Sequence, residues 1–264
     1  MIADTALAAV LTGVSHHYPG ETAGSLSGID LVLRRGERVA LIGPSGAGKS
    51  TLLTLLDGRL RGWRGGAVVL ADTLDPRAMP ARELRAEVGF IFQDFALVER
   101  ATVRRNTLNG RLGRAAPLAS FFGRFSAADH AAVEAAMADA GIADLAGKRV
   151  DRLSGGQRQR VAIARCLAQE PRLILADEPI NNLDPVRAES VLRLLGDVSR
   201  ERHATLIFSS HQPALAVRFA DRIVALKDGA VAYDGPPGEL TPERLAEVYS
   251  GAPEAGADAL RLVG

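Results

Sequence analysis

A glycine-rich segment directly after a short apolar run constrains the fold more than any other feature of the sequence. The run is VALI, which ends at Ile42, and the residues after it match the pattern G-x-x-x-x-G-K-[ST]. They are Gly43, Pro44, Ser45, Gly46, Ala47, Gly48, Lys49, Ser50 and Thr51. A strand that leads through such a loop into a helix forms a P-loop, in which converging backbone NH groups and the helix dipole bind phosphate. The segment therefore predicts an α/β domain that binds a nucleotide through these nine residues.

Two side chains of this loop carry specific chemistry. Lys49 is expected to reach the β- and γ-phosphates as a compact positive charge, and the Ser50 hydroxyl is expected to be a ligand of Mg2+. The alternative is a glycine-rich turn that matches the pattern by accident, and the strand that precedes the loop argues against it.

The bulk composition is that of an ordinary globular protein and excludes several classes. The chain has 264 residues and a formal net charge of +1, so its charge favours neither nucleic acid nor anionic lipid as a partner. The N-terminal residues lack a signal-peptide pattern, and no apolar run approaches the roughly 18 residues that span a bilayer. Cys166, the single cysteine, lies in the apolar pattern VAIARCLA and is interpreted as a buried thiol. We therefore expect no disulfide, which fits a reducing cytoplasm, and no membrane crossing by this chain alone.

Short apolar runs alternate with longer amphipathic stretches, as is typical of strands and helices in an α/β sheet. The runs RLILAD, ATLIFSS and DRIVALKDG are apolar on both faces, which predicts central parallel strands. Shorter patterns in residues 8–40 predict a small antiparallel layer, and alanine-rich periodicity after Phe95 predicts an inserted helical subdomain. The expected organisation is a single domain at 8–247, with a core at 8–93 and 161–247, a helical subdomain at 94–160 and a C-terminal tail at 248–264.

The apolar run before residue 177 ends in two consecutive carboxylates, Asp177 and Glu178. Because strand side chains alternate, the two acids are predicted to point in different directions. Asp177 is then expected to hold the Mg2+ shell, and Glu178 to polarise the attacking water as a general base. Two acids that merely solvate a strand end are the alternative, which the upstream P-loop disfavours.

A second glycine-rich segment, which precedes a long helical pattern, consists of Leu153, Ser154, Gly155, Gly156 and Gln157. It would place a second anion-binding cradle at a helix N-terminus. The segment resembles the signature motif of ABC transporter ATPases, and the resemblance covers nearly the whole chain. It implies an ABC cassette of the P-loop NTPase class, with a RecA-like parallel-sheet core, that binds ATP. It also implies a head-to-tail homodimer, in which residues 154–157 of one subunit close over the ATP of the other.

Four single residues also match ABC family positions. The resemblance implies that Gln93, in FIFQDF, contacts Mg2+ and the attacking water and links the core to the helical subdomain. It places Asp184, in NNLDP, across the dimer interface. His211, in SSHQ, is implied to touch the γ-phosphate and help orient water. Tyr18, in HHYPG, is implied to stack on adenine, with a packing role as the alternative.

Several exposed residues are expected outside the ATP machinery. His16 and His17 are interpreted as surface residues. The apolar residues just after Gln93 are expected to face a membrane partner or, alternatively, to pack in the core; they are Phe95, Leu97 and Val98. The arginines of the helical segment are interpreted as a solvated face, with a permease loop or lipid headgroups as the alternative; they are Arg104, Arg105, Arg111, Arg114 and Arg124.

Within the ABC family, the chain resembles the ATPase of phosphonate importers. The resemblance lies in the stretch from Phe92 to Gly113, which contains the LVER and GRLG blocks, and in the segments LAQEPRLILADEP and AYDGPP. It implies that ATP binding and hydrolysis drive uptake of a phosphonate or a related phosphate-like anion. The chain departs from the usual pattern at four positions: Asn181 and Asn182 replace an Ala-Ser type pair, Ala96 replaces Asn, and Ser210 replaces Leu.

The resemblance also implies partners and a location. The partners are a second copy of the chain, integral membrane permease subunits and, indirectly, a periplasmic or lipid-anchored substrate-binding protein, with the ATPase at the cytoplasmic face of the plasma membrane. The alternative is the ATPase of another importer or exporter, or of a cell-division-type membrane complex. Soluble two-cassette and coiled-coil DNA-repair types are disfavoured, because the chain has neither an internal repeat nor a long heptad run.

Overall fold

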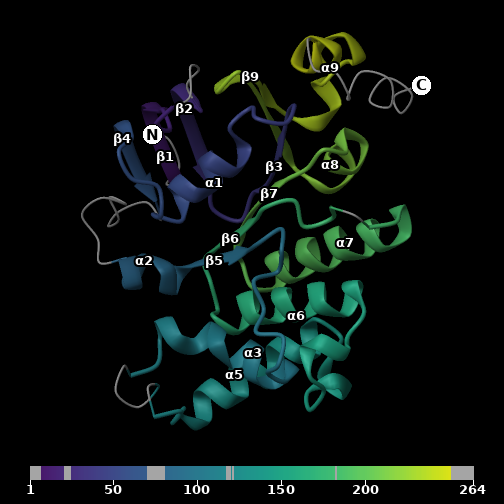
Figure 1. Ribbon diagram of the computed structural model, residues 1–264. Helices are drawn as coiled ribbons and strands as arrows, with labels where there is room; N and C mark the ends of the chain where they lie inside the picture. Colours follow the sequence, from purple (N-terminus) through teal and green to yellow (C-terminus); the bar gives the residue numbers. More distant parts are fainter. Residues whose placement is uncertain are drawn as a thin grey trace.

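The computed structural model describes residues 7–20, 25–69, 81–116, 120, 122–181 and 183–250 (Figure 1). Its strands are β1 Leu7–His16, β2 Leu26–Arg34, β3 Arg38–Ile42, β4 Arg64–Val69, β5 Val88–Ile91, β6 Leu173–Ala176, β7 Thr205–Ser209, β8 Arg222–Lys227 and β9 Ala230–Gly235. Its helices are α1 Lys49–Leu56, α2 Ala81–Glu87, α3 Val103–Leu108, α5 Ala127–Asp139, α6 Gly155–Ala168, α7 Pro185–Glu201, α8 Pro213–Phe219 and α9 Pro242–Tyr249. Short 3-10 turns are η1 Asn109–Gly113, η2 Ala143–Leu145, η3 Val150–Arg152 and η4 Pro237–Glu239.

A six-stranded sheet in the order β5-β6-β7-β3-β8-β9 forms the centre of the molecule. Its first five strands are parallel, and β9 pairs antiparallel with β8. Successive side chains of each central strand enter two different cores, as Ile174 and Leu175 of β6 illustrate. A strand buried on both faces reads as a continuous apolar run, so the central parallel strands expected from the sequence are confirmed.

A three-stranded antiparallel sheet, in the order β2-β1-β4, covers one face of the central sheet. Its inward side chains share a core with Leu52 and Leu56 of α1 and with Val39 and Leu41 of β3. The small antiparallel layer predicted from residues 8–40 is therefore confirmed. Figure 1 shows this layer and α1 on the side of the sheet opposite to α6 and α7.

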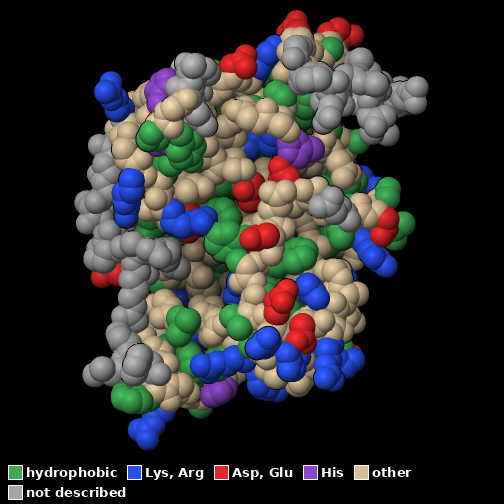
Figure 2. All heavy atoms as spheres, in the orientation of Figure 1, with side chains coloured by type: hydrophobic (Ala, Val, Ile, Leu, Met, Phe, Trp, Pro, Cys, Tyr) green, Lys and Arg blue, Asp and Glu red, His purple; other side chains and the backbone are tan. Residues whose placement is uncertain are grey.

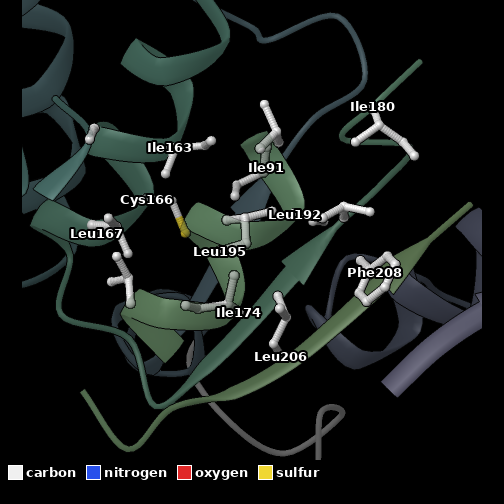
Figure 3. Packing of buried hydrophobic residues seen from close by; sticks show 14 of the residues in the cluster. Ile91, Ile163, Cys166, Leu167, Ile174, Ile180, Leu192, Leu195, Leu206 and Phe208 are labelled. Carbon is white, nitrogen blue, oxygen red and sulfur yellow. The ribbon is translucent and has the colours of Figure 1, made fainter. Parts of the chain in front are cut away.

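The other core lies between the central sheet and the helices α6 and α7. Ile163 and Leu167 of α6 and Leu195 of α7 pack there against strand residues such as Phe208 (Figure 3). Cys166 points into this packing, and burial raises the pKa of its thiol to about 12. The interpretation of Cys166 as a buried thiol is thus confirmed.

The segment between β5 and β6 contains helices and 3-10 turns in its described part. A capping box begins α5, in which the Ser126 hydroxyl accepts from the Asp129 amide and the Asp129 carboxylate accepts from the Ser126 amide. Asp129 also pairs with Arg111 at 2.8 Å. Burial acts to raise the pKa of Asp129, but the hydrogen bonds from Arg111 and Ser126 outweigh it, so this pKa lies below its usual value.

The interpretation of Arg111 as part of a solvated face is wrong. Arg111 is 7% exposed and donates to Asp129, to Glu170 and to the carbonyl of Ala168. Arg114 is exposed, as expected, and donates to the carbonyl of Gln169. The partners of Arg111 are distant in sequence, which is why charge pattern alone misplaced this residue. These two arginines tie the helical segment to the end of α6.

No helix in the described part of the chain is long and apolar enough to cross a membrane. Asn182 and the tail after residue 250, both named in the sequence predictions, lie outside the described residues.

Candidate functional site

The P-loop joins the end of β3 to the start of α1, and two of its glycines are required by contacts within the chain. A Cβ on Gly43 would lie 2.1 Å from the Leu226 carbonyl oxygen, and one on Gly48 would lie 2.3 Å from that of Ser25. Both have positive φ, 138° and 100°, which L side chains rarely adopt. The loop therefore holds its curled shape only with glycine at these positions.

The start of the loop is also held from the C-terminal end of the domain. The Gly43 amide donates to the hydroxyl of Tyr249, in α9, at 3.1 Å. Burial raises the pKa of this tyrosine, although the hydrogen bond from Gly43 opposes the shift. Lys227 in turn donates to the Glu247 carbonyl at 2.7 Å and so fixes the end of α9. Tyr249 was not among the residues predicted from the sequence, because it lies 206 residues from its partner.

Lys49 lies over the loop that precedes it. Its ammonium donates to the carbonyls of Gly43 and Pro44 at 2.8 and 2.9 Å, and the residue is 5% exposed. Burial lowers the pKa of Lys49, while the nearby carboxylates of Glu178 and Asp177 act against this shift. The fold thus brings the loop lysine within electrostatic reach of both acids predicted from the sequence.

Two hydroxyl groups converge on Asp177. The Ser50 hydroxyl, in α1, donates to Asp177 Oδ1 at 3.0 Å, and the Ser209 hydroxyl, at the end of β7, donates to the same oxygen at 2.8 Å. Mg2+ prefers oxygen ligands such as hydroxyl and carboxylate groups, and the ion usually keeps waters and phosphate oxygens as its other ligands. The pair Ser50 and Asp177 fits such an ion, and no cluster of three or more His, Cys, Asp or Glu suited to a metal occurs among the described residues.

Glu178 diverges from Asp177 for a reason other than the predicted strand alternation. Strand β6 ends at Ala176, and Glu178 adopts a left-handed backbone with φ 47°. Its amide donates to the Ser209 hydroxyl at 2.7 Å, so this serine holds both acids at once. A left-handed conformation in a non-glycine residue persists only where the surroundings enforce it. Ser209 was not among the residues predicted from the sequence.

The Glu178 carboxylate is contacted at both oxygens. His211 Nε2 lies in hydrogen-bonding contact with Oε1, and Asn181 Nδ2 donates to Oε2 at 3.0 Å. The Glu178 side chain is 14% exposed and that of His211 39%, so the pair remains open to small molecules on the histidine side. Figure 2 shows histidine, acidic and basic side chains side by side near the middle of this face.

Gln93 and Tyr18 lie in exposed positions beside the strands. Gln93 follows the end of β5 by two residues, and Phe95 and Ala96 after it have left-handed φ of 63° and 45°. Tyr18 is 39% exposed, and the edge of its ring meets His16 at a centroid distance of 4.6 Å and an interplanar angle of 87°. His16 is buried, so its interpretation as a surface residue is wrong, whereas His17 is exposed.

The signature segment lies at the N-terminus of α6. Ser154 caps this helix, with its hydroxyl accepting from the Gln157 amide and its own amide donating to the Gln157 side chain. Cβ atoms on Gly155 and Gly156 would meet none of the described residues within 4 Å, and neither glycine has positive φ. The described part of the chain therefore does not require glycine at these two positions, in contrast to the P-loop. Asp184 similarly caps α7 and pairs with Arg187.

Comparison with known proteins places these features in a family. The model of the ABC transporter family matches residues 26–181. A phosphonates import ATP-binding protein, PhnC 1, of Rhodopseudomonas palustris is 47% identical over 227 residues, which cover 85% of this chain and 81% of the relative. Another, PhnC 2 of Halalkalibacterium halodurans, is 39% identical and covers 90% of this chain and 97% of the relative.

Solved structures of similar fold agree. The cbiO1 protein of Clostridium perfringens, part of an ABC transporter complex, has a TM-score of 0.77 and 29% identity, with 89% of this chain and 90% of that chain covered. A dimeric ATP-binding cassette in a post-hydrolysis state bound to ADP and Pi has a TM-score of 0.71 and 30% identity, with 87% and 98% covered.

Proposed function

This chain belongs to the ABC transporter family and is an ATP-hydrolysing subunit, and from that premise we propose that it drives uptake of a phosphonate or a related phosphate-like anion. The cargo is proposed on the similarity to relatives named as phosphonate importers, which span nearly the whole chain. The proposed location is the cytoplasmic face of the plasma membrane, where the chain would be held by its permease partners.

The observation that carries the catalytic proposal is the convergence of Lys49, Ser50, Asp177 and Glu178 at the end of the sheet. Lys49 and the loop amides would bind the β- and γ-phosphates, while Ser50 and Asp177 would hold Mg2+, which supplies charge neutralisation when bound. Glu178 would accept a proton from the attacking water, and His211, against its Oε1, would orient that water. Gln93 would contact the same ion and water, and Tyr18 would stack on adenine.

The second proposal is that residues 154–157 serve the nucleotide of a second copy. Contacts with the described residues give no steric reason for glycine at positions 155 and 156, so a close approach from outside explains them better than packing does. The α6 N-terminus also presents amides and a positive dipole end to an anion. The family's cassettes form dimers, as the ADP- and Pi-bound neighbour does. Asp184 would lie across the same interface.

The membrane partner is a permease, and we propose that it docks beside the loop that follows Gln93. Val98 is 54% exposed there, whereas Leu97 packs partly against the core. Movement of this loop with the helical segment would transmit ATP-driven closure to the permease. A substrate-binding protein would deliver the anion from the other side of the membrane.

Glu178→Gln tests the catalytic proposal. The variant removes the base but keeps the size of the side chain, so ATP should still bind while turnover stops and the ATP-bound dimer accumulates. Steady-state ATPase rates, a nucleotide titration and the elution volume with ATP measure these three effects. Turnover near the wild-type rate would show that Glu178 is not the base.

The cargo needs a separate assay with the complete transporter. The chain, its permease and its substrate-binding protein should accumulate 2-aminoethylphosphonate in vesicles in an ATP-dependent manner, and Glu178→Gln should abolish the accumulation. Absence of uptake for any phosphonate, with normal ATPase activity, would refute the cargo and leave the ATPase proposal intact.

A further inference from the structure

Asn181 contacts the proposed general base, although it is not among the residues predicted from the sequence to take part in ATP chemistry. Its Nδ2 donates to Glu178 Oε2 at 3.0 Å, and its backbone amide donates to the Glu178 carbonyl at 3.1 Å. The two residues are therefore joined by a tight turn and, within it, by a side-chain hydrogen bond.

The turn explains how a residue three positions later reaches the base. Glu178 has a left-handed backbone, and Ser209 holds its amide at 2.7 Å. This conformation folds the chain back, so that the side chain at position 181 lies beside the carboxylate it follows. A residue with no polar side chain, such as alanine, could form the same turn but not the contact to Oε2.

The other oxygen of the Glu178 carboxylate, Oε1, faces His211 and not Asn181. His211 contacts Oε1, so Asn181 and His211 hold the two oxygens of one carboxylate from two separate elements of the chain. Without Asn181, His211 would be the one hydrogen-bonding side chain left on this carboxylate among the described residues, and the carboxylate could rotate about its terminal torsion, which is broad in glutamate. Productive proton transfer requires the base to lie within hydrogen-bond reach of the water.

We propose that Asn181 is a positioning residue that fixes the orientation of the Glu178 carboxylate and leaves Oε1, beside His211, to accept the proton from water. This inference rests on the proposed role of Glu178. Asn181 contacts neither the P-loop nor the Ser50–Asp177 pair in the hydrogen bonds that the described residues make, so it should affect turnover and not nucleotide affinity.

The test uses the full chain assembled with its permease and compares Asn181→Ala, Asn181→Asp and Asn181→Ser. Alanine removes the donor, aspartate keeps the shape but replaces the donor with a like charge, and serine restores a shorter donor. We expect kcat to fall about tenfold in the alanine variant, because an orientation that the hydrogen bond favours by about 1.4 kcal/mol is then about tenfold less populated. KM for ATP should stay within about twofold, aspartate should be worse than alanine, and serine should recover part of kcat.

A double-mutant cycle separates positioning from general damage to the turn. In the Glu178→Gln background no carboxylate remains, so Asn181→Ala should cause no further loss of the residual turnover. Equal losses in both backgrounds, a parallel change in kcat and KM, or an unchanged kcat in Asn181→Ala would overturn the proposal. Melting temperatures of all variants identify any that are unfolded. If Asn181→Ala is unfolded, Asn181→Ser replaces it in the comparison of turnover with the wild type.

The cycle also distinguishes this inference from the function on which it rests. If Glu178→Gln alone retains full turnover, the general-base assignment fails, and the positioning role fails with it. If Glu178→Gln is inactive while Asn181→Ala is normal, only the positioning role is refuted.

Discussion

Replacing Arg165 with methionine should release the loop that follows Gln93. Arg165 lies in α6, and its guanidinium donates to the carbonyl of Phe95 at 2.8 Å and to that of Ala96. Burial lowers the pKa of this arginine, although electrostatic interactions with Cys166 and Asp94 act to raise it. The helix that begins with the signature segment thus holds, near its other end, the loop that carries Gln93.

The magnitude follows from two opposed contributions. Phe95 and Ala96 both have left-handed φ, which costs about 1–2 kcal/mol per non-glycine residue, or about 2–4 kcal/mol together. Two hydrogen bonds from a charged donor supply about 1.5–3 kcal/mol each, or about 3–6 kcal/mol. The strain is present with or without the guanidinium, whereas the two hydrogen bonds are lost with it, so the local opening free energy should fall by about 3 kcal/mol or more.

Hydrogen exchange measured by mass spectrometry checks this expectation at peptide level. The Phe95 amide donates to the Phe92 carbonyl at 3.0 Å and reports on the turn directly. Its exchange should accelerate at least about 100-fold, since 1.36 kcal/mol corresponds to a factor of ten. Arg165→Lys keeps the charge with one compact donor group and should give a smaller change. Ala96→Gly in the Arg165→Met background should restore part of the protection, because glycine tolerates positive φ.

The reasoning is refuted if exchange in residues 92–98 changes no more than exchange in α7, or if Ala96→Gly leaves it unaffected. The former would mean that the loop holds its shape without the arginine, and the latter that left-handed strain is not what the arginine offsets.

Two further predictions concern the helical segment and the signature. Asp129→Asn should lower the free energy of unfolding by about 3 kcal/mol at pH 7, since it breaks a buried ion pair with Arg111. Because the pKa of Asp129 is lowered in the folded state, the stability that its charge contributes is present above the unfolded pKa, about 3.9, and is lost as pH falls through the folded pKa. A difference between the denaturant midpoints of the wild type and Asp129→Asn that persists undiminished at pH 2 would contradict this. Gly156→Ala should leave the monomer as stable or raise its stability by up to about 1 kcal/mol, because alanine is the better helix former. The same variant should lower ATP turnover, and full turnover would argue against a partner that approaches this glycine.

Local patterns predicted the parts of the site that lie within one stretch of chain. The P-loop combines strand, turn and helix within residues 38–56, so its sequence suffices to predict its shape. The acids after β6 were also identified, but the reason for their divergence was not, because the left-handed turn at Glu178 depends on Ser209, 31 residues later.

The residues that were misplaced or overlooked from the sequence have environments that only the folded chain creates. Arg111 finds Asp129 and Glu170, which lie 18 and 59 residues away, and no charge pattern indicates such a pairing. His16 is the first residue of the polar pattern HHY and the last of β1, yet it is buried. Both its ring nitrogens lack a hydrogen-bond partner in the described part of the chain. The exposed Asn181 looked like a mere departure from a family pattern, and only the folded turn reveals its contact.

The position of β7 between β3 and β6 sets the spacing of the two strand ends that carry the reacting groups. Two strand separations of about 4.8 Å set the main chains of β3, which leads into the P-loop, and β6, which leads into the acids, roughly 10 Å apart, and main-chain hydrogen bonds fix that interval. The side chains of Ser50 and Asp177 bridge the interval, so point substitutions there can change the reacting groups but not the spacing of the strands. The helical segment follows β5, the edge strand of the sheet, so a change in that segment leaves the interval untouched.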